Sequence, residues 1–170
     1  MKPVPEWEHV IVVGFDGSSH SEEALRWTVD EAKMRGSTVH IVHAWQPPLG
    51  TWSTSLKPIP DPADTTETDG EEYMRLFEDA VASVIGERPE VDVHTSVRVG
   101  NPAAVLIEAA KREHAELLVV GSRGNGGFKR LLLGSVSEQC VTHANCPVVV
   151  THEGKRSRVA KAEDRVVEPA

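Results

Sequence analysis

The stretch Val119-Val120-Gly121-Ser122-Arg123-Gly124 decides the fold, and it is followed after nine residues by Gly134-Ser135-Val136-Ser137. This pattern predicts an apolar strand that stops at a glycine, then a loop, then a helix that begins with hydroxyl side chains. Gly121 and Gly124 allow the backbone to take a positive φ and allow a ligand to approach closely. The first amides of the helix have no partner within it, so amides and helix dipole together favour a phosphate.

The spacing of the glycines excludes two common phosphate-binding loops. A Walker loop requires a lysine directly before its Ser or Thr, and Ser135 follows a glycine instead. A dinucleotide-binding loop requires Gly-x-Gly-x-x-Gly after the first strand, where this chain has Gly14-Phe15-Asp16-Gly17-Ser18-Ser19. The pattern that remains is Gly-x2-Gly-x9-Gly-Ser.

Apolar runs and capping signals alternate along the chain. We predict helices that start at a Ser19/Glu22 capping box, at Asp69, at Asn101-Pro102 and at Ser135. The predicted strands are Val10–Val13, Thr38–Ala44, Val91–Val97, Leu117–Val120 and Cys146–Thr151. Such alternation predicts an α/β fold with a single open parallel five-stranded sheet and helices on both faces.

The hydropathy of the strands predicts their order in the sheet. The first and fourth strands are continuously apolar, which places them in the centre, whereas the third alternates with polar residues and belongs at an edge. The order is then 3-2-1-4-5. Ligands of such sheets bind at the switch point beyond the carboxyl ends of the central strands. This brings Gly14-Phe15-Asp16 and Gly121–Gly124 to one crevice.

Composition excludes several classes of partner. The 170 residues are 39% hydrophobic and 26% charged, which is typical of one soluble domain. A formal net charge of -8 argues against a nucleic-acid partner and against an anionic membrane surface. No apolar run is long enough to cross a membrane, and residues 1–7 lack the apolar segment of a secretion signal. We therefore expect a cytoplasmic protein.

The domain boundaries follow from changes in composition. We predict an N-terminal extension over residues 1–7, a domain over 8–152 and a disordered charged tail over 153–170. Within the domain, residues 46–69 form a proline-rich loop, and so long a loop is usually a lid, a binding loop or a disordered segment.

Neither the cysteines nor the histidines form a recognisable site. Cys140 and Cys146 lack metal-site spacing, so we expect reduced thiols in the protein interior. His40 and His43 are three residues apart on a strand and should point to opposite faces. We predict no metal ligands within the protein and no catalytic residues.

Several motifs occur in an order that resembles a known family. These are Gly14-Phe15-Asp16-Gly17-Ser18, Gly100-Asn101-Pro102, the Gly-x2-Gly-x9-Gly-Ser signature, and Cys146-Pro147-Val148-Val149-Val150. Over residues 8–152 the chain resembles the ATP-binding class of the universal stress protein family. The resemblance implies a Rossmann-like fold of the adenine nucleotide alpha hydrolase type and a dimeric, ATP-binding sensor or regulator of the stress response.

The resemblance also implies the residues of the nucleotide site. Asp16 would lie near the adenine or ribose, or help to hold Mg²⁺ on the phosphates, although it also suits a turn that accepts local amides. Ala44 would offer its backbone to the adenine. The full predicted set is Gly14, Phe15, Asp16, Ala44, Val120, Gly121, Ser122, Arg123, Gly124, Gly134, Ser135, Val136 and Ser137.

The last strand predicts a homodimer. Val148, Val149 and Val150 are apolar on both faces, yet their strand ends the sheet and would expose an open edge. Pairing with the same strand of a second copy would cover that edge, as the family resemblance also implies. Three alternatives to an ATP-binding sensor remain open: a slow ATP-hydrolysing enzyme, a module for AMP or cyclic AMP, and a protein-interaction module with a vestigial pocket.

Overall fold

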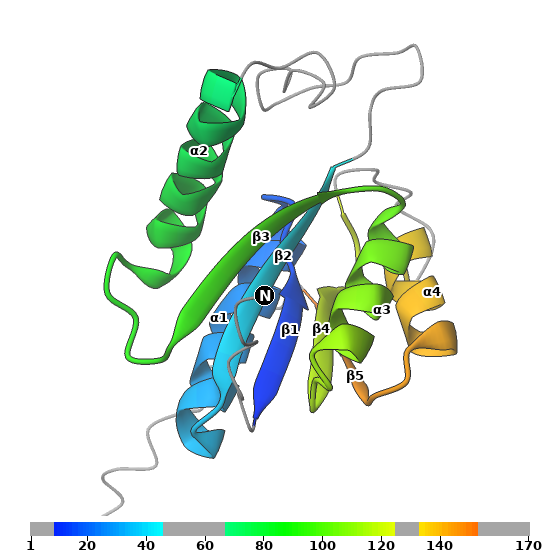
Figure 1. The fold of residues 1–170 in the computed structure, drawn as a ribbon. Helices are drawn as coiled ribbons and strands as arrows, with labels where there is room; N and C mark the ends of the chain where they lie inside the picture. Colours follow the sequence, from blue (N-terminus) through cyan, green and yellow to red (C-terminus); the bar gives the residue numbers. More distant parts are fainter. Residues whose placement is uncertain (1–8, 46–66, 125–132, 153–170) are drawn as a thin grey trace, which may run out of the picture.

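The computed structural model describes residues 9–45, 67–124 and 133–152, in which strands and helices alternate along the chain (Figure 1). The elements are β1 (Val10–Gly14), α1 (Ser19–Arg35), β2 (Thr38–Trp45), α2 (Glu67–Ile85), β3 (Val93–Val99), α3 (Pro102–Arg112), β4 (Leu117–Gly121), α4 (Ser135–His143) and β5 (Val148–Thr151). The predicted extension, the tail and residues 46–66 of the predicted loop lie outside the described residues. The last three residues of that loop belong to α2.

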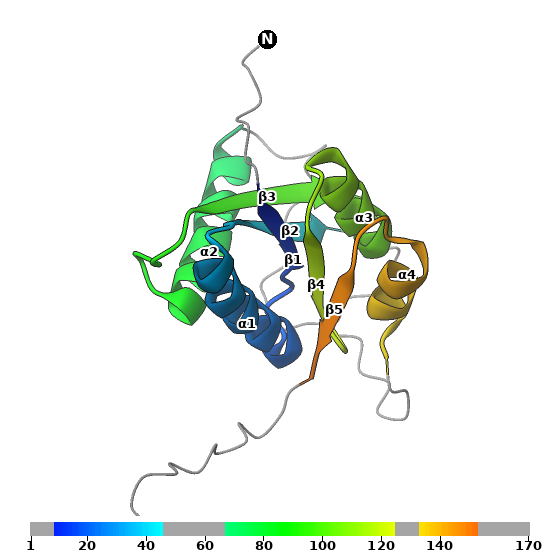
Figure 2. The same ribbon diagram turned by 90° about the horizontal axis from the view of Figure 1, so that it is seen from below.

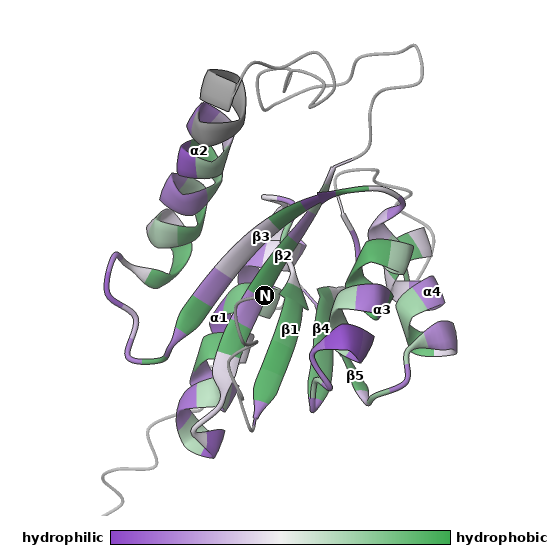
Figure 3. Ribbon diagram, viewed as in Figure 1, coloured by the Kyte–Doolittle hydropathy of each residue, from purple (hydrophilic) through white to green (hydrophobic). Residues whose placement is uncertain are grey.

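The five strands form one parallel sheet in the order β3-β2-β1-β4-β5, as predicted. Seen along the sheet, α1 and α2 cover one face and α3 and α4 cover the other (Figure 2). Alternate side chains of β1 point to the two faces of the sheet. Ile11 and Val13 pack with α1 and α2, whereas Val10 and Val12 pack with α3. The strand order confirms the inner position predicted for β1 and β4, and Figure 3 shows that both strands are hydrophobic.

The boundaries of the outer strands differ from those predicted. β3 lies at the edge as expected, and none of its residues is fully buried, but it begins and ends two residues later than the apolar alternation indicated. Its bounds follow from pairing, since β3 is in register with β2 from Val39↔Val93 to Trp45↔Val99. β5 likewise begins two residues late, at the first pair with β4, Leu118↔Val148.

Side-chain caps fix the starts of two helices. The N-cap of α1 is Ser18, whose hydroxyl accepts from the Ser21 amide at 3.3 Å, so the predicted capping box at Ser19 was wrong by one residue. The N-cap of α3 is Asn101, followed by Pro102, as predicted. α2 begins at Glu67, two residues before the predicted Asp69.

Asn101→Ala is expected to lower the stability of the protein by about 1 kcal/mol, because the Ala104 amide, 3.1 Å from Asn101 Oδ1, would lose its acceptor. For a chain of this size the melting temperature would fall by about 2–4 °C. Thermal unfolding of Asn101→Ala beside Asn101→Asp, which keeps an acceptor, measures the effect. An unchanged melting temperature in Asn101→Ala would contradict the assignment of the cap.

The two neighbouring histidines of β2 point to opposite faces of the sheet, as predicted. His40 is buried on the α3 side, where its Nδ1 lies 2.6 Å from Glu113 Oε2. His43 lies on the α2 side, with its ring 5.5 Å from the ring of Phe77. Within the described ranges no group of three or more His, Cys, Asp or Glu is placed to hold a metal ion.

Cys140 is buried and Cys146 is half-buried. Both are free thiols, and burial raises the pKa of both.

Glu113→Gln is expected to flatten the acid dependence of stability. Burial opposes the ionisation of Glu113, but hydrogen bonds and charge from His40 and Arg112 outweigh it and hold the pKa of Glu113 below its usual 4.5. A carboxyl with a lowered folded pKa adds stability above its unfolded pKa, and this stability is lost as the pH falls through the folded pKa. Urea unfolding of both proteins between about pH 7 and pH 3 checks this; parallel curves would contradict it.

Candidate functional site

The carboxyl ends of β1 and β4 lie side by side at the centre of the sheet, where the chain leaves β1 toward β2 and leaves β4 toward β5. This is the topological switch point, at which open α/β sheets bind their ligands. We call the residues that follow these two strands, together with the start of α4, the switch-point site.

Among the described helices none is long and apolar enough to span a bilayer.

Asp16 connects the two loops of the switch-point site. Its Oδ1 accepts from the amide of Ser18 at 3.0 Å and from the hydroxyl of Ser18 at 2.5 Å, so one oxygen makes the turn that the sequence allowed. Its Oδ2 faces the glycine loop, since a Cβ built on Gly124 would lie 2.7 Å from it. The structure therefore brings together Asp16 and Gly124, which are far apart in the sequence.

The glycines of β4 and its loop leave room for close approach between segments of the protein itself. Neither Gly121 nor Gly124 has a positive φ, so that expectation was wrong. A Cβ on Gly121 would lie 2.8 Å from the backbone carbon and oxygen of His20 in the first turn of α1. Gly121 thus permits the close approach of α1 to the end of β4, and Gly124 leaves room for the Asp16 carboxylate.

Ser122 and Ser137 hold the start of α4 against the end of β4. The Ser122 carbonyl accepts from the Gly134 amide at 2.6 Å, and the Ser137 hydroxyl lies 3.1 Å from the same carbonyl and 2.9 Å from that of Gly134. The Ser122 amide donates to Thr151 at 2.7 Å, and both serine side chains are buried. The Ser122 backbone and the Ser137 hydroxyl therefore fix the start of α4 from the interior, whereas Ser135 is exposed at the surface of the site.

The N-terminus of α4 has features that suit an anion. Among the residues that the structure describes, no side chain caps it, whereas Ser18 and Asn101 cap α1 and α3. The first hydrogen bond of α4 runs from Glu138 to Gly134, so the amides of Ser135, Val136 and Ser137 precede the helical ladder. A row of amides at the positive end of a helix dipole suits a phosphate.

The backbone of Ala44 points toward the switch-point site. In β2 the Val42 carbonyl accepts from the Phe15 amide at 3.1 Å, on the β1 side, while the Trp45 carbonyl accepts from Gly100 at 2.9 Å, on the β3 side. Because the direction of backbone groups alternates along a strand, Ala44 points the same way as Val42. β1 has already ended at Gly14, opposite Val42, so the amide and carbonyl of Ala44 face the space beyond β1.

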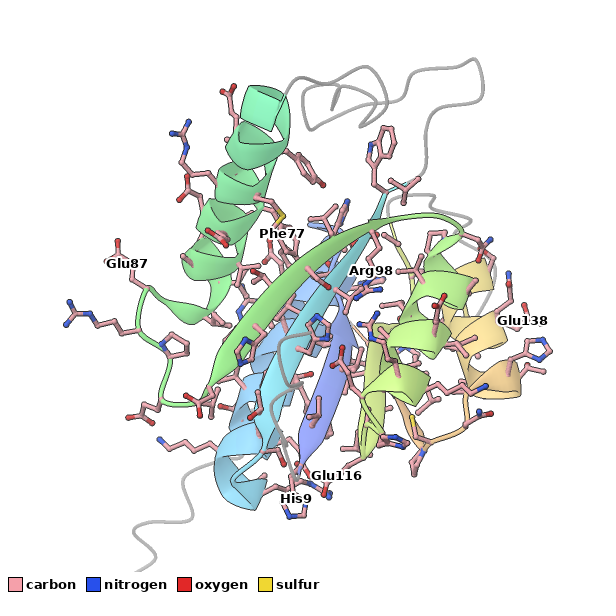
Figure 4. All side chains as sticks on the ribbon, viewed as in Figure 1. His9, Phe77, Glu87, Arg98, Glu116 and Glu138 are labelled. Atoms are coloured by element: carbon pink, nitrogen blue, oxygen red, sulfur yellow. The ribbon has the colours of Figure 1, made fainter. Side chains whose placement is uncertain are left out.

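An aromatic cluster behind β1 was not predicted. His43 Nδ1 lies 2.8 Å from the Phe15 carbonyl, and its ring is 6.0 Å from that of Tyr73. Phe15 is buried, with its ring 6.0 Å from that of Phe77, which Figure 4 shows between α2 and the sheet. Burial raises the pKa of Tyr73 to about 12. Phe15 and the buried Val120 therefore offer only their backbones to a ligand.

Comparison with known proteins gives consistent results. A model of the universal stress protein family matches residues 9–152. A universal stress protein of Mycolicibacterium smegmatis is 35% identical over 148 residues, which cover 85% of this chain and 48% of that protein. The chain thus spans about half the length of the first curated relatives it matches.

Solved structures share the fold. A universal stress protein in complex with cAMP superposes with a TM-score of 0.59 at 24% identity, covering 86% of this chain and 98% of that one. An Arabidopsis thaliana universal stress protein family protein with AMP bound has a TM-score of 0.56 at 20% identity, covering 92% and 99%. At these identities the likeness establishes the architecture alone.

Proposed function

The chain belongs to the universal stress protein family, and from that premise we propose that it is an adenine-nucleotide-binding module whose ligand occupies the switch-point site. The observation that carries the proposal is the uncapped N-terminus of α4, held by Ser122 and Ser137 beside the glycine loop and Asp16. It offers amides to an anion, while the backbone of Ala44 offers one donor and one acceptor to a base edge.

Adenine suits this pair of backbone groups. Its N1 accepts a hydrogen bond and its N6 amino group donates one, which complements an amide and a carbonyl on one strand. The related structures with cAMP and AMP bound support the same ligand class. We propose ATP as the physiological nucleotide, with Mg²⁺ on its phosphates near Asp16, and a role as a sensor or regulator of the stress response in the cytoplasm.

The test is direct titration of the nucleotide-free protein. We expect ATP to bind in isothermal titration calorimetry with one site per chain, and adenine nucleotides to bind more tightly than GTP, whose guanine carries a carbonyl where adenine carries the amino group. Titrations with and without Mg²⁺ test the metal. Equal affinities for ATP and GTP would show that Ala44 does not recognise the base. Binding of neither nucleotide would refute the proposal.

We also propose a homodimer through β5. Val148, Val149 and Val150 end the sheet and are only half-buried in the single chain. The Leu118 amide donates to the Pro147 carbonyl and the Ser122 amide to the Thr151 carbonyl. By alternation Val148 and Val150 point their amides away from β4, toward the open edge.

Val150→Pro is expected to convert this dimer to a monomer. Proline removes an amide on the open edge and leaves the bonds to β4 in place. Light scattering coupled to size-exclusion chromatography measures the mass, and a melting curve verifies the fold. A Val150→Pro protein that remains dimeric would place the interface elsewhere.

A further inference from the structure

A second group of polar side chains lies on the α3 side of the same sheet, on β2 and β3. His40 is at its centre: Nδ1 lies 2.6 Å from Glu113 Oε2 and Nε2 lies 2.8 Å from Ser96 Oγ. The side chains of His40 and Glu113 are 7% and 11% exposed. Glu113 is the C-cap of α3, at the far end of α3 from Asn101, whereas Ser96 pairs with Val42 and so is level with Gly14 at the end of β1.

The hydrogen bonds suit one order of the protons. The lowered pKa of Glu113 favours its carboxylate, which can accept a proton from His40 Nδ1. Nε2 then carries a lone pair that accepts the hydroxyl proton of Ser96. Hydroxyl, imidazole and carboxylate thus form a chain of the kind that activates a serine nucleophile.

Ser96 lies at the edge of the sheet. It is half-buried on β3, the edge strand, while α3 packs chiefly against β1, β2 and β4. The sheet on this side is therefore least covered at β3.

Arg98 adds a cation on the same face. It lies two residues from Ser96 along β3, and Figure 4 shows it between β3 and α3. Its Nε is buried and has no hydrogen-bond partner among the described residues. A buried donor without a partner is costly, and an oxygen anion beside Ser96 would satisfy it.

We propose that Ser96, His40 and Glu113 form an acyl-transfer centre that takes a small carboxylic ester. Ser96 Oγ attacks the carbonyl carbon and its proton passes to His40 Nε2, while Arg98 faces the anion that develops on the carbonyl oxygen. The bond to the alcohol breaks, and the alcohol leaves with the proton from Nε2. Water then repeats the two steps and releases the acid, so ester and water give acid and alcohol.

Glu113 is a positioning residue, because it acts through His40. In the alternative account, the same hydrogen bonds only fasten α3 to β2 and β3. A catalytic role and a structural role of these hydrogen bonds predict different reactivities of Ser96, because a structural serine has no activated hydroxyl.

The test is labelling of the full chain with a fluorescent alkyl fluorophosphonate, which forms a P–O bond at an activated serine and releases fluoride. We expect one adduct, mapped to Ser96 by mass spectrometry, and none in Ser96→Ala. Ser83→Ala is the matched control, since Ser83 is exposed and its hydroxyl donates to the carbonyl of Ala80 within α2. His40→Gln should slow labelling by at least about 100-fold.

The pH profile separates positioning from packing. In the wild type the labelling rate should depend on pH, because a base must take the proton of Ser96; the charged and titratable groups around this base are Glu113, Arg112, His94 and Arg98. In Glu113→Gln the rate should fall by at least about tenfold and its pH profile should shift, because the carboxylate no longer fixes the imidazole tautomer. A structural role would change neither.

Two results would overturn the proposal. One is labelling of wild type no greater than that of Ser96→Ala, and the other is labelling at Ser96 that His40→Gln leaves unchanged. Ser96→Ala leaves the buried Nε2 of His40 without this partner, so it should lower the melting temperature by a few degrees, but it should keep the nucleotide binding of wild type. Binding of ATP by every variant shows that the fold is intact and that the two sites are separate.

Discussion

Gly134→Glu is expected to abolish nucleotide binding and leave the protein folded. Gly134 is the N-cap of α4, with φ -76°, a conformation open to any residue. A glutamate there places a negative charge beside the amides proposed to hold the phosphates. Two like charges 4 Å apart near a protein surface repel by about 4 kcal/mol, so the affinity should fall by more than about 100-fold.

The matched control is Gly134→Gln, which has the same length without the charge. Both side chains meet the same neighbours, since a Cβ at Gly134 would lie 3.3 Å from the Ser122 carbonyl oxygen. Any loss shared by the two variants is therefore steric, and the additional loss in Gly134→Glu is electrostatic. Titration calorimetry with ATP measures both. Wild-type affinity in Gly134→Glu would mean that the phosphates lie elsewhere.

Gly121→Ala is expected to destabilise the protein by about 1–3 kcal/mol. The new methyl would lie 2.8 Å from backbone atoms of His20, which cannot move unless α1 shifts as a whole. The melting temperature should fall by about 2–4 °C for each kcal/mol lost. The affinity for ATP should also fall, because α1 and the Asp16 turn that precedes it would be displaced from β4.

Gly14→Ala provides the comparison for this prediction. Its methyl would also meet an atom at 2.8 Å, but that atom is Cδ1 of Leu106, the end of a flexible side chain. We therefore expect a smaller loss of stability than in Gly121→Ala. Thermal unfolding of the two variants under one set of conditions decides the matter, and an equal or larger loss in Gly14→Ala would contradict the account of Gly121.

Local patterns were sufficient to predict the fold. The strand order followed from the continuous apolar runs of β1 and β4 and from the alternation in β3. The hydropathy pattern of a strand shows whether one or both of its faces are buried. The cap at Asn101 was equally local. Boundaries were less accurate where pairing decides them, as in β3 and β5, whose ends depend on the neighbouring strand.

The geometry of the sites was harder to predict, because it depends on contacts between distant segments. The serine-rich start of α4 predicted hydroxyls for a phosphate, yet Ser137 turns inward to carbonyls that the fold brings behind it. The reason for Gly121 lies in the approach of His20. His40, Ser96 and Glu113 come from three elements and meet only after two crossovers, so no spacing in the sequence predicts them.

Thermal unfolding of the nucleotide-free protein with ATP, ADP, AMP, cyclic AMP and GTP, each with and without Mg²⁺, tests the central claim most directly. A ligand at 100 times its Kd adds about 2.7 kcal/mol to the stability of the folded state, which raises the melting temperature by several degrees. We predict such a shift with ATP, and a smaller one or none with GTP. No shift with any of these nucleotides at concentrations above about 1 mM, where even weak ligands bind, would contradict the claim that this chain binds adenine nucleotides.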